Sequence, residues 1–358
     1  QYLFRSTDRG ESWKAISPDL TTNDPQGQRQ LESGGITVDN STAENYTTIY
    51  SISESPLSHR TIWVGTDDGN LQLTRNGGRS WDNVVGNIEG VPAGTWVSRV
   101  EASPHDEATA FVTFDGHRRG DMNTYVFRTT DFGQTWAPII TDVIDGYAWV
   151  IKQDPVNPNL LFLGTEEGLY ITLDQGENWA RFSENLPRVA VHDLVIHPTE
   201  HDLVIGTHGR GVYVIDDITP LRGLNQEIID ANVAVLDTRS APMILNAQLQ
   251  SFGAHDAFVG SHPPQAATIV YYLKKRHLFG RQAPRAQPRR VAHALQGTQV
   301  PAGHKPRAGL PGPACARGPV PRGADERQGD ERVDRAACRR SAHAAQQARP
   351  YRPADAGA

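Results

Sequence analysis

An eight-residue motif that occurs four times in the first half of the chain most constrains its fold. The consensus is S/T-x-D-x-G-x-S/T-W, and the copies occupy residues 6–13, 74–81, 129–136 and 172–179. A second pattern alternates with it: a proline turn, an apolar run and a glycine turn, with the prolines at positions 56, 104, 155 and 198. Self-similarity at a spacing of about 40–50 residues is typical of repeat folds. Residues 1–216 are therefore expected to consist of repeated units.

The residue types of this Asp motif predict a tight turn followed by a buried tryptophan. The side chain at its third position accepts hydrogen bonds from backbone N–H groups just ahead. The glycine supplies a positive φ at no steric cost, and the indole ring is expected to pack in the core between sheets. We expect structural roles for all members, which are Asp8, Gly10, Trp13, Asn76, Gly78, Trp81, Asp131, Gly133, Trp136, Asp174, Gly176 and Trp179.

Short runs of alternating apolar residues separate the motifs and predict β-strands. One unit reads as strands at residues 48–53, 61–65, 70–74 and 82–85, with turns between them. Four strands in a repeat of this length are typical of a propeller blade. The predicted fold class is all-β: an incomplete β-propeller of four-stranded blades over residues 1–216, with three complete units and a half blade at each end.

The motif resembles the Asp-box, or BNR repeat, of sialidase-like propellers. Together with the Gly-Thr turns, such as Gly65-Thr66 and Gly164-Thr165, it is most similar to sortilin/Vps10-type propellers, in particular a group of large secreted bacterial proteins often labelled glycosyl hydrolases. The resemblance covers residues 1–280. It implies a secreted or periplasmic location, and it implies that residues 271–280 hold the first strand of a β-sandwich. Because the chain starts inside an expected strand, we expect the first blades of the propeller to lie outside it.

The remainder of the chain lacks the repeat. Residues 217–260 are expected to form an exit segment with a short helix near Pro220 and a strand at 231–236, and residues 261–280 the first strand of the β-sandwich. Residues 281–358 carry 15 Lys and Arg against six Asp and Glu, with Tyr351 as their one aromatic residue. Such a segment has too little apolar surface for a core. It is expected to be a disordered tail or the out-of-frame translation of a GC-rich gene.

Propeller topology predicts which turns share a face. Turns between the second and third strands of each blade lie with the connections between blades, opposite the Asp motifs. This face carries five carboxylates, at Asp67, Asp68, Asp115, Glu166 and Glu167. It also carries the aromatic and basic candidates for ligand binding, which are Tyr46, Trp96, His117, Arg118, Tyr147, Trp149, His192, His208 and Arg210.

Two functions fit this face. The first is a scaffold that binds a protein, peptide or glycan, since flat rings bury area while polar groups orient the ligand. The alternative is a glycoside hydrolase, which requires two carboxylates about 5–9.5 Å apart, with Asp115 and one of the other four as candidates. A purely structural role also remains open, with Trp96 and Trp149 filling the channel and the carboxylates as solvated turn residues. A sialidase is disfavoured, because its Arg-Ile-Pro motif is absent and no arginine triad can be assigned.

Other chemistries lack sequence support. The first 280 residues contain no cysteine, so a Cys-ligated zinc site there is excluded, and no metal or other cofactor is expected. No phosphate-binding glycine loop, HExxH motif or nucleophile elbow occurs. The basic tail has charge but no motif for specific nucleic-acid binding. No apolar run approaches the roughly 20 residues that span a bilayer.

Overall fold

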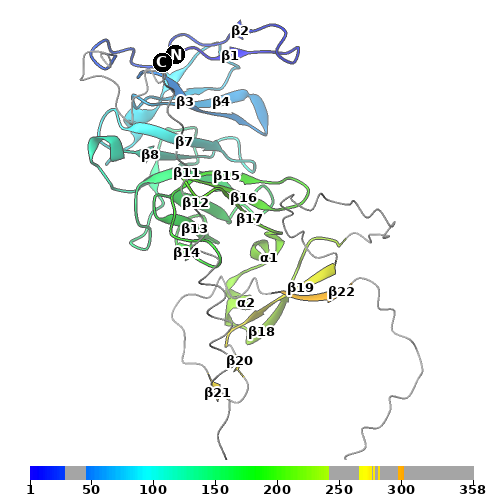
Figure 1. Cartoon of the computed structure of the whole chain (residues 1–358). Coiled ribbons are helices and arrows are strands. Elements are labelled where there is room, and N and C mark those ends of the chain that lie inside the picture. Colours follow the sequence, from blue (N-terminus) through cyan, green and yellow to red (C-terminus); the bar gives the residue numbers. More distant parts are fainter. Residues whose placement is uncertain (29–45, 242–265, 276, 279–280, 283–296, 302–358) are drawn as a thin grey trace, which may run out of the picture. The chain divides into compact units, whose positions relative to one another are not determined.

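The computed structural model describes residues 1–28, 46–241, 266–275, 277–278, 281–282 and 297–301 (Figure 1). Antiparallel sheets follow one another along the first part of the chain, and each is built from strands that are consecutive in sequence. A two-stranded N-terminal hairpin comes first, with β1 (Phe4–Arg5) and β2 (Lys14–Ala15). Its strands correspond to the last two strands of a blade, because the first Asp motif joins them.

Three four-stranded sheets follow. Blade I contains β3 (Ile49–Ser55), β4 (Ser58–Thr66), β5 (Leu71–Thr74) and β6 (Asp82–Asn83). Blade II contains β7 (Trp96–Ala102), β8 (Ala110–Asp115), β9 (Tyr125–Thr129) and β10 (Ala137–Pro138). Blade III contains β11 (Ala148–Gln153), β12 (Leu161–Thr165), β13 (Gly168–Thr172) and β14 (Ala180–Phe182).

Blade IV has three strands, β15 (Val191–Ile196), β16 (Leu203–Thr207) and β17 (Val212–Ile215). The first strands of successive blades contact one another, β3 with β7, β7 with β11 and β11 with β15 (Figure 1). Repeated four-stranded sheets whose first strands contact one another in this way are the blades of a β-propeller. The predicted all-β propeller fold is confirmed.

The Asp motifs form the predicted turn in all four copies. In blade II, Asp131 Oδ1 accepts from the Thr135 backbone N at 2.9 Å, and Asp131 Oδ2 accepts from Thr135 Oγ1 at 2.6 Å. Thr129 Oγ1 donates to Asp131 at 2.8 Å and accepts from Gly133 N at 2.9 Å. The same set of bonds recurs around Asp8 and Asp174. It also recurs around Asn76, except that Asn76 Nδ2 donates to Ser80 Oγ where the aspartates accept. Hydrogen bonds from Ser12 lower the pKa of Asp8 to about 2, so this carboxylate stays charged at neutral pH.

The glycine and tryptophan of the motif contact the preceding blade. A Cβ on Gly78 would lie 2.2 Å from the carbonyl oxygen of Ile16, and one on Gly176 would lie 2.8 Å from Ile139 Cβ. The indole N–H of Trp81 donates to Ile16 O at 3.1 Å, and that of Trp179 donates to Ile139 O at 2.7 Å. The indole N–H of Trp136 instead donates to Gly133 O of its own motif at 3.2 Å, but its ring meets Trp63 of blade I edge-on at 6.0 Å. In blades I to III the motif is therefore both a turn and a contact with the preceding sheet.

The first copy is the exception, and here the prediction of a buried tryptophan is wrong. Trp13 is 65% exposed, and its indole N–H folds back onto Gly10 O at 3.1 Å. A Cβ on Gly10 would meet only Trp13 within 4 Å. Within the described residues no blade precedes the N-terminal hairpin, so the tryptophan has nothing to pack against. Trp81 and Trp136 are half-buried, and Trp179 is buried.

The C-terminal end of the blades is covered differently. After β17 the chain forms α1 (Thr219–Arg222) and α2 (Gln226–Asp230) where the other blades have an Asp motif. Ile218 and Leu221 are fully buried in one cluster with Phe182 and Leu186. The predicted short helix near Pro220 is present. Among the described residues no helix is long and apolar enough to cross a bilayer.

A separate antiparallel sheet follows, with strand order β18 (Val233–Leu236), β19 (Ala266–Leu273) and β22 (Gly297–Pro301). Leu236, Val270 and Tyr272 face the core cluster of blade IV. Two short strands pair with each other, β20 (His277–Leu278) and β21 (Arg281–Gln282). β21 and β22 lie within the segment expected to be a tail, most of which is outside the described residues. The β-sandwich and the nature of the tail stay predictions.

The blade contacts generate a test on two glycines with the same backbone geometry. Gly10 and Gly78 both have φ of 94°, but only Gly78 faces a neighbouring carbonyl. Gly10→Ala is expected to cost about 1–2 kcal/mol of unfolding free energy for the left-handed conformation alone. Gly78→Ala should cost about 1–3 kcal/mol more because the methyl group overpacks the interface. Urea unfolding followed by tryptophan fluorescence measures both, and equal losses would contradict this account of the blade contact.

Candidate functional site

A row of aromatic and imidazole rings crosses blades II, III and IV at the ends of their strands. The His117 ring stacks on Tyr147 with centroids 4.6 Å apart and an interplanar angle of 12°. Tyr147 is followed by Trp149 at 5.7 Å, Trp149 by His192 at 4.0 Å, and His192 by His208 at 4.9 Å. We call these five side chains the ring row. All five were expected on one face, and the structure brings them into contact.

A second cluster joins blades I and II. The Trp96 ring meets Tyr50 edge-on at 4.6 Å, and the guanidinium of Arg118 lies 4.2 Å from the Trp96 ring centroid, a cation–π arrangement. Tyr46 lies nearby through a 3.3 Å hydrogen bond from Arg119 Nη2 to its hydroxyl. Arg210 is exposed in the turn after β16, and no hydrogen bond or ring contact joins it to either cluster in the described part of the chain.

A β-bulge at the start of the innermost strand of each blade positions several of these rings. The register shifts between Ile49 and Ser51, between Ala148 and Val150, and between Val191 and Asp193, so Tyr50, Trp149 and His192 are the extra residues. Bulges redirect side chains and are common next to functional sites. Blade II has the same shift at Ser98, whose hydroxyl donates to Ala148 O at 3.0 Å.

The glycine of the Gly-Thr pairs explains why the bulges lie where they do. Gly65 and Gly164 pair with the residue directly after the bulge. A Cβ on Gly65 would lie 2.4 Å from Val97 Cγ1, and one on Gly164 would lie 2.6 Å from Val191 O, both on the next blade. The absence of a side chain lets successive innermost strands approach. The sequence predicts the Gly-Thr pairs only as turns and does not predict the bulges, so Tyr50 was not expected in the site. Arg119 was not expected there either.

Asp115 is held by His117. Its side chain is fully buried, and both oxygens lie 2.7 Å from His117 Nδ1, while Oδ1 also accepts from the His117 backbone N at 2.9 Å. A carboxylate at Nδ1 selects the tautomer that carries its proton there. His117 therefore presents Nε2 as its second ring nitrogen.

The other four candidate carboxylates are engaged as well. Asp67 accepts from Thr48 N at 2.7 Å and from its hydroxyl at 2.8 Å, and Asp68 accepts from Thr22 N and Oγ1 at 2.7 Å. Glu166 accepts from the Tyr147 hydroxyl at 2.8 Å, and Glu167 pairs with Arg188. Each one fastens a connection between blades to a strand end. All four therefore have partners, although only Asp68 is buried and the other three are partly exposed.

The surroundings shift the protonation of two members of the ring row. Burial, the hydrogen bond to Glu166 and the charge of that carboxylate raise the pKa of Tyr147, which therefore stays a neutral hydroxyl donor. Burial, together with the neighbouring His208, lowers the pKa of His192 below its ordinary value. His192 is therefore neutral at pH 7. Among the described residues no group of three or more His, Cys, Asp or Glu is arranged to hold a metal ion.

Comparisons with known proteins add a fold-level likeness only. No family model and no curated protein matches the chain. A GH74 enzyme of Niastella koreensis is similar with a TM-score of 0.43 and 11% identity, over 60% of this chain and 32% of that chain. A GH74 xyloglucanase of Xanthomonas campestris is similar with a TM-score of 0.41 and 14% identity, over 60% of this chain and 33% of that chain. YCF48 bound to D1 peptide is similar with a TM-score of 0.36 and 20% identity, over 47% of this chain and 52% of that chain. The chain thus spans between about a third and a half of the length of these structures.

The depressed pKa of His192 predicts a specific pH dependence of stability. The unfolded chain binds a proton near pH 6.5, whereas folded His192 binds it only at lower pH. The contribution of neutral His192 to the free energy of unfolding is therefore complete above pH 6.5, and it is lost as the pH falls through the pKa of the folded state. NMR titration should place the His192 pKa below 6.5, and His208→Gln should raise it partway.

Urea unfolding of His192→Gln at several pH values provides the control. Its free energy of unfolding should fall less steeply below pH 6.5 than that of the wild type. A slope identical to the wild-type slope would show that His192 does not couple to folding.

Proposed function

We propose that the chain is a sortilin/BNR-like propeller that binds a protein, peptide or glycan through the ring row. The observation that carries this proposal is the continuity of the row, in which five rings from three blades contact one another in sequence. Residues of separate blades have no local reason to align their rings. Flat rings with polar edges bury ligand area and orient it at the same time.

The engagement of the carboxylates supports binding over hydrolysis. A glycoside hydrolase needs one carboxyl group that donates a proton and a second that attacks or activates water. Both oxygens of Asp115 contact His117, and its side chain is buried. Asp68 is 3% exposed and bonded to two threonines. These contacts suit residues that hold loops in place.

The cellular setting belongs to the same proposal. The Asp motifs with their Gly-Thr turns resemble those of secreted bacterial propellers, and four copies of the motif adopt the same hydrogen-bonded turn here. We place the protein outside the cytoplasm, in the periplasm or medium of a bacterium. Detection of the native protein in periplasmic or culture-supernatant fractions tests this part.

The binding role predicts a large effect of Trp149→Ala. Ligands would be selected from a glycan array and a random-peptide library against the wild-type chain, and affinities measured by calorimetry. Trp149→Ala should weaken the selected ligand at least about tenfold, because a central aromatic contact typically contributes more than 1 kcal/mol. Trp13→Ala is the matched control, since Trp13 is exposed beside an Asp motif. His208→Ala, at the end of the row, gives a second readout should Trp149→Ala fold poorly.

Hydrolysis is tested separately with Asp115→Asn. The wild type is expected to release no reducing ends from a panel of plant and bacterial polysaccharides, and Asp115→Asn is expected to weaken ligand binding because His117 loses its fixed orientation. Turnover by the wild type that disappears in Asp115→Asn, with the fold intact by circular dichroism, would replace the binding proposal with the hydrolase.

A further inference from the structure

β17 is the outermost strand of blade IV, and one of its edges is open. In blades I, II and III a fourth strand, β6, β10 or β14, pairs with the third strand. Blade IV has three strands, and within the described residues β17 pairs with β16 only (Figure 1). An edge of this kind presents unpaired backbone N–H and C=O groups and is a template for a further strand.

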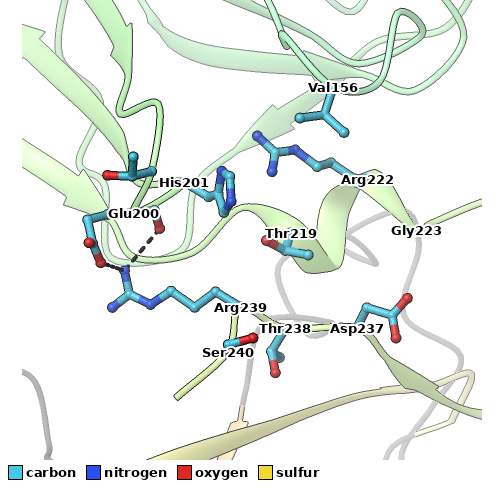
Figure 2. Close-up of a pocket in the computed structure, with 11 residues that line it drawn as sticks. Val156, Glu200, His201, Thr219, Arg222, Gly223, Asp237, Thr238, Arg239 and Ser240 are labelled. Atoms are coloured by element: carbon cyan, nitrogen blue, oxygen red, sulfur yellow. Dashed lines mark hydrogen bonds and ion pairs between the residues drawn. The ribbon is translucent and has the colours of Figure 1, made fainter. Parts of the chain in front are cut away.

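The chain after β17 is fastened away from this edge. Asp217 has a φ of 53°, which turns the backbone, and Ile218 N donates to His201 O in the β15–β16 turn at 2.8 Å. Asp217 Oδ2 accepts from Arg239 N at 2.8 Å. The Arg239 side chain donates in turn to Glu200 Oε2 at 3.0 Å (Figure 2). These contacts direct the chain toward the β15–β16 turn rather than back along β17.

The helix that follows is tied to blade III. Arg222 Nη2 donates to Asp154 Oδ2 at 2.8 Å, and the two side chains are 9% and 0% exposed. Asn157 Nδ2 adds a hydrogen bond to Arg222 O at 3.0 Å. α1 is thereby held against blade III, and among the described helices and strands only β16 lies alongside β17.

The blade repeat shows which backbone groups face the open edge. Val212 holds the position in β17 that Leu71 holds in β5, directly opposite the glycine of the Gly-Thr pair. In blade I, Leu71 O accepts from Val84 N at 2.8 Å, at the end of the fourth strand. The N–H and C=O of Val212 therefore point toward the open edge. Backbone groups alternate along an antiparallel strand, so those of Val214 point the same way.

The side chains of the same residues are exposed valines. Val212 and Val214 are 67% and 51% exposed, whereas the equivalent Leu71 is 0% exposed. Val214 lies directly across from the half-buried Val204, and Val204 lies across from Val195, which is 52% exposed. A row of valines thus crosses one face of blade IV and reaches the open edge.

β17 lacks the features that normally protect an edge from pairing. Charged residues, prolines and bulges on outer strands prevent association of sheets. The outer strands of the four preceding sheets each contain a charged residue or a proline, which are Lys14, Asp82, Pro138 and Arg181. β17 reads Val-Tyr-Val-Ile, and its ladder with β16 has no register shift. It is therefore suited to pairing with another strand.

Opposite charges flank the strand. Arg210 precedes Val212 by two positions, and Asp216 follows Val214 by two. Both are exposed, and no ion pair joins either side chain to another described residue. If Tyr213 lies opposite Tyr213 of a second, antiparallel copy, then Val212 lies opposite Val214 and Arg210 opposite Asp216. Opposite charges and branched apolar residues stabilise such cross-strand pairs.

We propose that two copies of the chain associate by antiparallel pairing of β17 around a two-fold axis at Tyr213. In this register Val212 and Val214 of the two copies exchange both backbone hydrogen bonds, and the interface is self-complementary. A strand of the same sequence satisfies the edge, the valines and both charges at once, which is why the occupant is a second copy. A short strand buries less than the roughly 1,200–2,000 Å² of stable interfaces, so the Kd is on the order of 10–100 µM.

Sedimentation velocity of the full chain at about 5 to 500 µM spans this Kd. Reducing conditions prevent cross-linking through Cys315 and Cys338. The wild type should pass from monomer to dimer, and Val214→Lys should raise the Kd at least about tenfold, because a lysine on the edge opposes pairing. Val195→Lys is the matched control, since this valine is equally exposed on the same face but lies two strands from the edge. It should leave the Kd within about twofold.

A charge reversal tests the register. Arg210→Glu and Asp216→Arg each place like charges opposite one another at both ends of the paired strands, and each should raise the Kd about tenfold. The double variant restores opposite charges and should return the Kd to within about threefold of the wild type. A wild type that stays monomeric over the whole range would overturn the proposal. So would a dimer that Val214→Lys leaves unchanged, that Val195→Lys weakens as strongly, or that the double variant fails to restore.

Discussion

The contact of each Asp motif with the blade before it is the interaction on which the rest of the structure depends. Local hydrogen bonds close the turn, and the turn presents an indole N–H and a bare glycine to the preceding chain, as at Trp179 and Gly176. Blades I, II and III are thereby each packed against the sheet before them. The ring row requires that packing, because it is assembled from side chains of different blades. Trp13 shows the converse, since without a preceding sheet in the described residues the same motif leaves its ring in solvent.

The innermost strands, packed in this way, form the face that carries the ring row. A bulge in each strand redirects one residue, and a glycine on the neighbouring strand lets the next blade approach. Tyr50, Trp149 and His192 occupy equivalent positions but belong to two clusters, because blade II has the small Ser98 at its bulge. Carboxylates around the rings bind loops and neighbouring side chains. The face therefore presents contacting rings, and burial shifts the pKa values of Tyr147 and His192 among them.

Blade IV differs from the blades before it. After β17, α1 stands where the other blades have an Asp motif, and it fills the core with Ile218 and Leu221. The ion pair of Arg222 with Asp154 ties this helix to the blade before it, as the tryptophans do elsewhere. One short helix thus takes the place that the Asp motif has in the other blades. In the N-terminal hairpin, a Cβ on Gly10 would meet only Trp13 of the same motif within 4 Å.

The sequence alone determined the strands, the blades and the turn of the Asp motif, because these follow from alternation, spacing and hydrogen bonds within eight residues. It also placed the ring row on one face, since propeller topology sorts turns by their position in the blade. Only the tertiary structure decided which rings touch, because inter-blade packing joins residues that are far apart in sequence, such as His117 with Tyr147 and Trp149 with His192. It also decided that Asp115 binds His117 and that Arg222 binds Asp154 across 68 positions. No local pattern encodes such partners, which depend on how whole blades are set against one another.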